Sequence, residues 1–92
     1  MSGRLDGVRI VVTGASRGLG RALAEAFAAE GARLVLTATS VPRLEAVRAR
    51  VHQDARSVHP VALDLRDRAS VARAAAEAVA ELGRVDVRVA NA

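Results

Sequence analysis

The chain has 92 residues, about half of them hydrophobic, and a formal net charge of +4, so we expect one small domain. It holds no cysteine, which excludes disulfides and thiolate catalysis. Its only histidines are His52 and His59, and this pair argues against a metal site. All 14 basic residues are arginines interleaved with acids, and neither Tyr nor Trp is present to stack on bases, so we expect no nucleic-acid partner.

The first expected strand and helix follow one another at the start of the chain. Residues 8–13 form a run rich in β-branched side chains, which is typical of a strand buried on both faces of a parallel sheet. From residue 18 to residue 30 the apolar side chains recur at helical spacing, and Gly31 stands where a helix commonly ends. The side chains that we expect on the inner face of this helix are Leu19, Leu23, Ala26 and Phe27.

A second strand and helix are expected next. Residues 34–38 form another apolar run, which predicts a buried strand. Ser40 suits the N-cap of a helix that extends to about residue 52. Pro42 lies in the first turn of that helix, where its missing N–H does no harm.

The rest of the chain repeats the alternation. Residues 57–63 predict a third strand, and the alanine-rich residues 68–82 predict a helix that ends at Gly83. Residues 85–90 predict a fourth strand. The order β-α-β-α-β-α-β indicates an α/β fold with a parallel sheet and right-handed crossovers, formed by residues 1–92 as a single domain.

Three glycines lie between the first strand and the first helix, in the stretch V-T-G-A-S-R-G-L-G at residues 12–20. Gly14 allows a tight turn, Gly18 leaves room for a pyrophosphate to approach, and Gly20 lets the helix pack closely on the sheet. The N–H groups at the start of a helix favour an anion. We therefore predict a nucleotide-phosphate site here; the alternative is a glycine-rich turn without a ligand.

These motifs resemble those of the short-chain dehydrogenase/reductase family. Thr13 and the three glycines match its fingerprint T-G-x-x-x-G-x-G. The stretch V-A-L-D-L at residues 61–65 is similar to the segment that carries the family's adenine-contacting aspartate, here Asp64. V-A-N-A at residues 89–92 is similar to the start of the motif N-N-A-G, with Ala90 in place of its first asparagine. The resemblance implies a Rossmann-type doubly wound sheet, of which this dinucleotide-binding domain is the N-terminal portion, incomplete at its C-terminus.

The resemblance also implies a set of cofactor-binding residues; we expect no catalytic residue and no metal ligand in the chain. The set is Gly14, Ser16, Arg17, Gly18, Leu19, Gly20, Thr39, Asp64, Leu65 and Asn91.

The residues after the second strand indicate which dinucleotide is preferred. The segment T-A-T-S at residues 37–40 has no acid that could hold the ribose 2′-OH of NAD. Arg17 matches a position where basic residues of the family meet the 2′-phosphate of NADP. We therefore expect NADP, with NAD as the alternative. Arg43, one helical turn further on, either adds to that phosphate site or belongs to a solvated helix face.

The family's chemistry needs residues that this chain does not contain. In the family a serine polarises the carbonyl, and a tyrosine, with a lysine four residues later, donates the proton. The sequence has no Tyr and no Lys, so we expect no turnover by these 92 residues alone. The resemblance implies the cofactor-binding portion of an oxidoreductase that acts on small-molecule carbonyl or alcohol substrates. The alternative is a free-standing, non-catalytic nucleotide-binding or regulatory module.

Two expectations concern the surroundings of the chain. The fourth strand is expected at an edge of the sheet with Arg88 exposed, and we expect self-association through this edge. The longest stretch without a charge, residues 34–42, is far too short to span a membrane, and the N-terminus lacks a signal-peptide core. We therefore expect no membrane partner and a cytoplasmic location.

Overall fold

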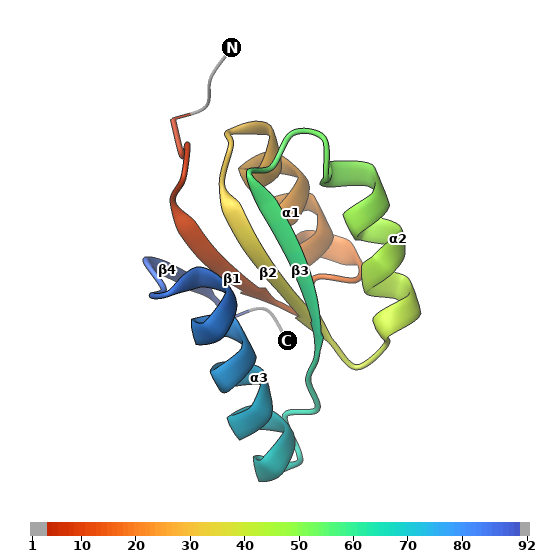
Figure 1. The fold of residues 1–92 in the computed structure, drawn as a ribbon. Coiled ribbons are helices and arrows are strands. Elements are labelled where there is room, and N and C mark those ends of the chain that lie inside the picture. Colours follow the sequence, from red (N-terminus) through yellow and green to blue (C-terminus); the bar gives the residue numbers. More distant parts are fainter. Residues whose placement is uncertain (1–3, 91–92) are drawn as a thin grey trace.

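The computed structural model describes residues 4–90, which form strands and helices in strict alternation (Figure 1). In chain order the elements are β1 (Arg9–Thr13), α1 (Gly18–Ala29), β2 (Arg33–Ala38), α2 (Val41–Val51), β3 (Ser57–Ala62), α3 (Arg68–Leu82) and β4 (Val87–Val89). The predicted order is confirmed. Most bounds differ from the expected ones by one residue at most, but β4 is three residues long instead of six.

All strands of the sheet are parallel, and their order is β3-β2-β1-β4. The chain therefore proceeds outward from β1 to β3 and then crosses over to the opposite side of β1. As Figure 1 shows, α1 and α2 cover one face of the sheet and α3 covers the other. This is the expected doubly wound α/β arrangement. In such sheets ligands bind at the carboxyl ends of the strands, near the point where the order reverses.

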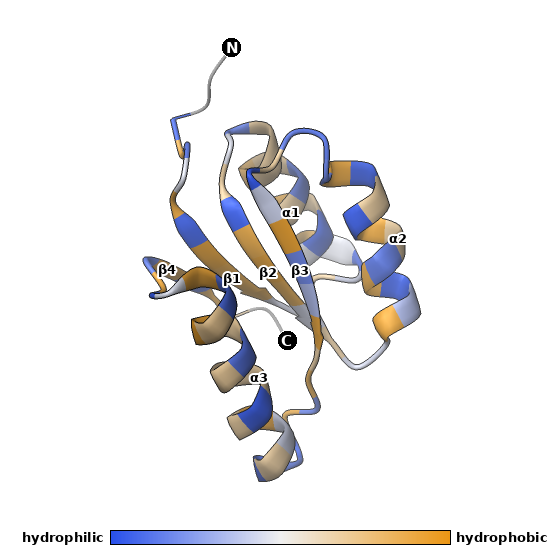
Figure 2. Cartoon of the chain, viewed as in Figure 1, coloured by the Kyte–Doolittle hydropathy of each residue, from blue (hydrophilic) through white to orange (hydrophobic). Residues whose placement is uncertain are grey.

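The core has two layers because successive side chains of a strand point to opposite faces of the sheet. Ile10 and Val12 of β1 face α1 and α2, together with Leu34 and Leu36 of β2. Val11 and its neighbours face α3, in a smaller layer of Val11, Val35, Val61, Ala74, Ala78 and Leu82. In Figure 2 most of β1 and β2 is orange, β3 is mixed, and the helices alternate between apolar and blue segments. The apolar strands are packed between two helical layers, and the loops that follow β1, β2 and β3 are attached to the carboxyl ends of these strands.

The inner face of α1 differs from the expected one. Its buried residues are Gly20, Ala24 and Ala28, which lie four positions apart on one stripe. Leu19, by contrast, is 65% exposed, and Ala26 is exposed as well. The expectation was wrong for these two residues because small side chains, not the larger ones, let the helix approach the sheet closely.

β4 is a short edge strand that is bonded to β1. The Thr13 hydroxyl donates to the carbonyl oxygen of Val89 at 3.2 Å, and the Asp86 N–H donates to the carbonyl oxygen of Arg9 at 2.9 Å. Arg88 is exposed, as expected, and Val87 is 41% exposed.

Along residues 4–90, no helix has the length and apolar character needed to cross a bilayer.

Candidate functional site

A cavity of about 550 Å³ lies at the carboxyl ends of β1, β2 and β3. The loops that follow these three strands form its wall. The lining residues are Thr13, Gly14, Ser16, Arg17, Gly18, Leu19, Thr37, Ala38, Thr39, Leu63, Asp64, Leu65 and Arg66. Segments far apart in the sequence meet here because parallel strands end at the same edge of the sheet.

The turn from β1 to α1 requires glycine at two positions. Gly14 has φ 65° and Gly18 has φ 60°, a left-handed backbone that other residues adopt only with strain. A Cβ placed on Gly18 would meet no atom within 4 Å, so the protein itself does not fill the space beside it. The Ala15 N–H donates to the carbonyl oxygen of Thr37 at 3.0 Å, which ties this turn to the end of β2.

The start of α1 lacks the side-chain cap that the other helices of residues 4–90 possess. Ser40 caps α2 by accepting from the Arg43 N–H, and Asp67 caps α3 by accepting from the Ala69 N–H at 2.9 Å. The N-cap of α1 is Arg17, whose side chain forms no cap hydrogen bond, and the first turn of α1 contains no acid. The first N–H groups of a helix have no partner inside it and carry partial positive charge. This helix end therefore offers donors to an anion in the cavity.

Two exposed leucines border the same cavity. Leu19 in the first turn of α1 is 65% exposed, and Leu65 in the loop after β3 is 66% exposed. They are the most exposed of the large apolar side chains described. Apolar walls combined with a few polar groups are typical of small-molecule sites, and a flat apolar ligand group would cover such side chains.

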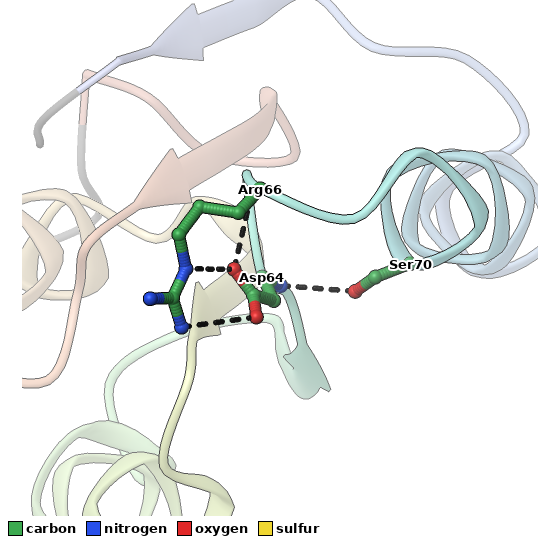
Figure 3. Close-up of polar contacts among 3 residues, drawn as sticks. All are labelled: Asp64, Arg66 and Ser70. Atoms are coloured by element: carbon green, nitrogen blue, oxygen red, sulfur yellow. Dashed lines mark hydrogen bonds and ion pairs between the residues drawn. The ribbon is translucent and has the colours of Figure 1, made fainter.

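Asp64 is the acid of the cavity, and its neighbours hold it in a defined position (Figure 3). Its backbone N–H donates to the Oγ of the buried Ser70 in α3 at 2.9 Å. Its Oδ1 accepts from the backbone N–H of Arg66 at 3.0 Å and from Nε of Arg66 at 3.1 Å, while Oδ2 accepts from Nη2 at 3.3 Å. The side-chain hydrogen bonds from Arg66 lower the pKa of Asp64, so this group is an ionised acceptor at neutral pH.

Most of the residues predicted to bind a cofactor line this cavity. They are Gly14, Ser16, Arg17, Gly18, Leu19, Thr39, Asp64 and Leu65. Gly20 lies instead on the buried stripe of α1, where it faces the sheet, and Asn91 lies outside the described residues. Arg43 is exposed on α2 and does not belong to the lining.

The structure adds lining residues that the sequence analysis did not include among the candidates. They are Thr13, Thr37, Ala38, Leu63 and Arg66. Thr37 pairs in register with Thr13, so the ends of β1 and β2 could have been placed together from the parallel order alone. Arg66 follows Asp64 by two positions, the spacing at which an aspartate commonly bonds the backbone of a turn. The described residues contain no cluster of His, Asp and Glu that could hold a metal ion.

Comparison with known proteins gives a consistent result along nearly the whole chain. The family model described as short chain dehydrogenase matches residues 9–92. Sorbitol dehydrogenase from Cereibacter sphaeroides is 42% identical over 89 residues, which cover 97% of this chain and 34% of that protein. D-threitol dehydrogenase from Mycolicibacterium smegmatis is 40% identical over 89 residues, covering 97% of this chain and 34% of that protein.

Solved structures show the same fold. The crystal structure of L-sorbose reductase from Gluconobacter frateurii, complexed with NADPH and L-sorbose, matches with a TM-score of 0.89 and 34% identity. The match covers 100% of this chain and 35% of the reductase. The chain thus spans about a third of the length of these relatives.

Proposed function

Since the chain belongs to the short-chain dehydrogenase family, we propose that its cavity holds the adenosine-phosphate half of a nicotinamide dinucleotide, with NADP preferred over NAD. The nicotinamide of such a cofactor supplies the hydride chemistry when it is bound. The residues of this chain bind and orient the other half of the molecule.

The observation that carries the proposal is the uncapped start of α1. Among the described helices, only this one begins at the cavity and lacks a side-chain acceptor for its first N–H groups. Negatively charged pyrophosphate oxygens would accept from these N–H groups and would be favoured by the helix dipole. The open space beside Gly18 admits such a group close to the backbone.

The opposite side of the cavity suits the adenine base. The Asp64 carboxylate would accept a hydrogen bond from the exocyclic amino group of the base. Leu65 beside it would cover part of the ring, and this contact would remove its exposed side chain from water.

The charges around the cavity favour NADP. Its charged lining residues are Arg17, Asp64 and Arg66, and Asp64 is the single acid. Residues 39–44, which follow β2, contain no acid, and Thr39 among them lines the cavity, so no acid at that position would repel a 2′-phosphate. Arg17 would add a charge-assisted contact to that phosphate. The NADPH in the similar L-sorbose reductase supports this preference.

Calorimetric titration of the chain with 2′,5′-ADP and with 5′-AMP tests this proposal. We expect 2′,5′-ADP to bind about tenfold or more tightly, since a hydrogen bond to a charged group contributes roughly 1.5–3 kcal/mol. Equal or tighter binding of 5′-AMP would reject the NADP preference. Failure of both ligands to bind would reject the nucleotide site.

We propose further that the chain is the N-terminal, cofactor-binding portion of an oxidoreductase, and that the oxidoreductase acts on small-molecule carbonyl or alcohol substrates. Neither Tyr nor Lys occurs in these residues, so the proton donor of the reaction is not among them. The purified chain should therefore not oxidise NADPH with any carbonyl compound. That lack of Tyr and Lys also suits the second candidate, a non-catalytic nucleotide-binding or regulatory module. An in-frame downstream sequence carrying Y-x-x-x-K would decide for the oxidoreductase. A cytoplasmic location stays a prediction.

A further inference from the structure

Arg66 has an unusual set of bonds for a surface arginine. Its side chain is 88% exposed and could extend into water. It folds back instead onto the carboxylate two residues earlier, to which its Nε and Nη2 both donate (Figure 3). Its own backbone N–H donates to the same carboxylate. Three donors of one residue are thus directed at Asp64, which lines the cavity together with it.

These bonds occupy the carboxylate unevenly. A carboxylate oxygen offers about two acceptor positions. Oδ1 of Asp64 accepts two hydrogen bonds from Arg66, whereas Oδ2 accepts one, at 3.3 Å. The contacts within residues 4–90 therefore leave one acceptor position of Asp64 for a ligand, and that position is on Oδ2.

We propose that Arg66 is a positioning residue that selects the base of the bound nucleotide by fixing Asp64 with one open acceptor position on Oδ2. Adenine presents an amino donor at its six-position and matches this acceptor. Hypoxanthine presents an oxo group at the same position, and two acceptors would then face each other. This inference rests on the proposed function, because it assigns selectivity to the same cavity.

The rest of the loop does not depend on Arg66. The Asp64 N–H is bonded to Ser70 in α3, and the Asp64 carbonyl oxygen accepts from the Asp67 N–H at 3.1 Å. Removal of the arginine side chain should leave this backbone in place, together with the hydrogen bond from the N–H of residue 66 to Oδ1, and should remove only the two bonds that fix the orientation of the carboxylate from the side chain. The variant would then bind adenine and hypoxanthine nucleotides more equally while the fold is kept.

The test compares 2′,5′-ADP with its hypoxanthine counterpart, inosine 2′,5′-bisphosphate, by calorimetric titration of the chain. Arg66→Ala should reduce the ratio of the two affinities roughly two- to fivefold, the range expected for an exposed ion pair. Arg66→Lys keeps the charge but cannot form the paired bonds of a guanidinium, so it should restore part of the ratio. Arg68→Ala is the matched control, because Arg68 is exposed, lies outside the lining and has no ion pair among the described residues.

A double-mutant cycle and a pH profile separate positioning from a general effect of charge. In an Asp64→Asn background, Arg66→Ala should leave the ratio unchanged, because the group that it positions is absent. The ratio of the two affinities should fall in acid, as Asp64 becomes protonated. Without Arg66 this fall should occur at higher pH, because the hydrogen bonds from Arg66 lower the pKa of Asp64. Ionisation of the ligands, of adenine as well as of the phosphates, is the same for both proteins and cancels when the pH profile of the variant is compared with that of the wild type.

The outcomes distinguish the inference from the proposed function. If the wild-type chain binds both nucleotides and Arg66→Ala leaves the ratio of their affinities unchanged, the inference is overturned but the proposed function is not. An equal fall in Arg68→Ala would also overturn it, because net charge would then be the cause. A wild-type chain that binds neither nucleotide would reject the proposed function, and the inference with it.

Discussion

At the scale of single residues, Gly18 has two separable roles. Its φ of 60° favours glycine, and the space beside it is open toward the region where we propose the phosphates. Gly83, at the end of α3, has φ 79° and equally open surroundings but lies outside the cavity. The two glycines therefore share the backbone requirement and differ in the proposed ligand contact.

This difference gives the first prediction. Gly18→Ala and Gly83→Ala should each lower the free energy of unfolding in urea by about 1 kcal/mol, because alanine is strained at positive φ. Gly18→Ala alone should also weaken 2′,5′-ADP, since its methyl group occupies the path of the phosphates. Equal affinity in the two variants would count against a phosphate site at this turn.

Arg17 gives a second prediction at this scale. Arg17→Ala should weaken 2′,5′-ADP about tenfold or more and should affect 5′-AMP much less, because the lost contact is to the 2′-phosphate. Arg21→Ala is the control: this arginine is exposed on the same helix but does not line the cavity. Calorimetry on both variants with both ligands measures the effect, and a similar loss for both ligands would place the 2′-phosphate elsewhere.

Single residues also show how far the sequence could predict the site. The position of Asp64 beside the glycine turn could be predicted, because parallel strands bring their carboxyl ends together. The bonds between Arg66 and Asp64 could not, since an exposed arginine has many conformations and only the geometry of this loop selects one. Thr37 was overlooked although the parallel order of β1 and β2 places it beside Thr13; its hydroxyl is buried without a hydrogen-bond partner in the described structure.

At the scale of elements, the order of strands and helices was predictable and the inner face of α1 was not. Buried β-branched runs and glycines at helix ends identify the elements locally. The close approach of Gly20 to the sheet was predicted, but the buried stripe that it forms with Ala24 and Ala28 was not, because which face a helix buries depends on its distance from the sheet. β4 was predicted too long because valines recur at alternate positions from Val85 on, whereas only Val87–Val89 pair with β1 in the structure.

An ion pair attaches the N-terminal segment to the start of β3 and predicts a response to acid. Arg56 donates from Nε and Nη2 to the two carboxylate oxygens of Asp6, at 2.8 and 3.0 Å. These hydrogen bonds lower the pKa of Asp6 below its ordinary value of 3.8. A carboxyl whose pKa is lower in the folded state stabilises the fold above its ordinary pKa. That contribution is lost as the pH falls through the lowered value.

We therefore expect the free energy of unfolding to fall below about pH 4 and the loss to be smaller in Asp6→Asn than in the wild type. Urea unfolding between pH 7 and pH 3 measures this dependence. Asp54→Asn is the control, because Asp54 is exposed and has no ion pair among the described residues. If Asp6→Asn and the wild type lose stability in parallel, the ion pair does not contribute.

At the scale of the whole molecule, β4 leaves one edge of the sheet open. It pairs with β1 on one side only, and Val85 and Val87 beside this edge are 39% and 41% exposed. Unpaired backbone groups on an edge strand offer a template for another strand. We predict that the chain self-associates through β4, with Arg88 opposing this only in part because its side chain can extend into water.

Size-exclusion chromatography with light scattering tests this prediction. Val87→Lys should shift the chain toward the monomer, because a lysine on an edge strand discourages pairing. Val79→Lys is the control, since Val79 is 52% exposed but belongs to α3 and not to the strand that would pair. A wild-type chain that elutes as a sharp monomer and unfolds cooperatively would contradict the prediction and would favour the free-standing module.

The central claim is that the carboxyl ends of the strands bind the adenosine-phosphate half of a dinucleotide. Amide chemical-shift mapping of the isotope-labelled chain during titration with 2′,5′-ADP tests it most directly. We expect the largest changes in residues 14–20 and 63–66, which line or flank the cavity, and small changes at the opposite end of the sheet, around Asp6 and Arg56. The claim would be contradicted by saturable shifts centred on that opposite end, or by no saturable shifts at millimolar nucleotide.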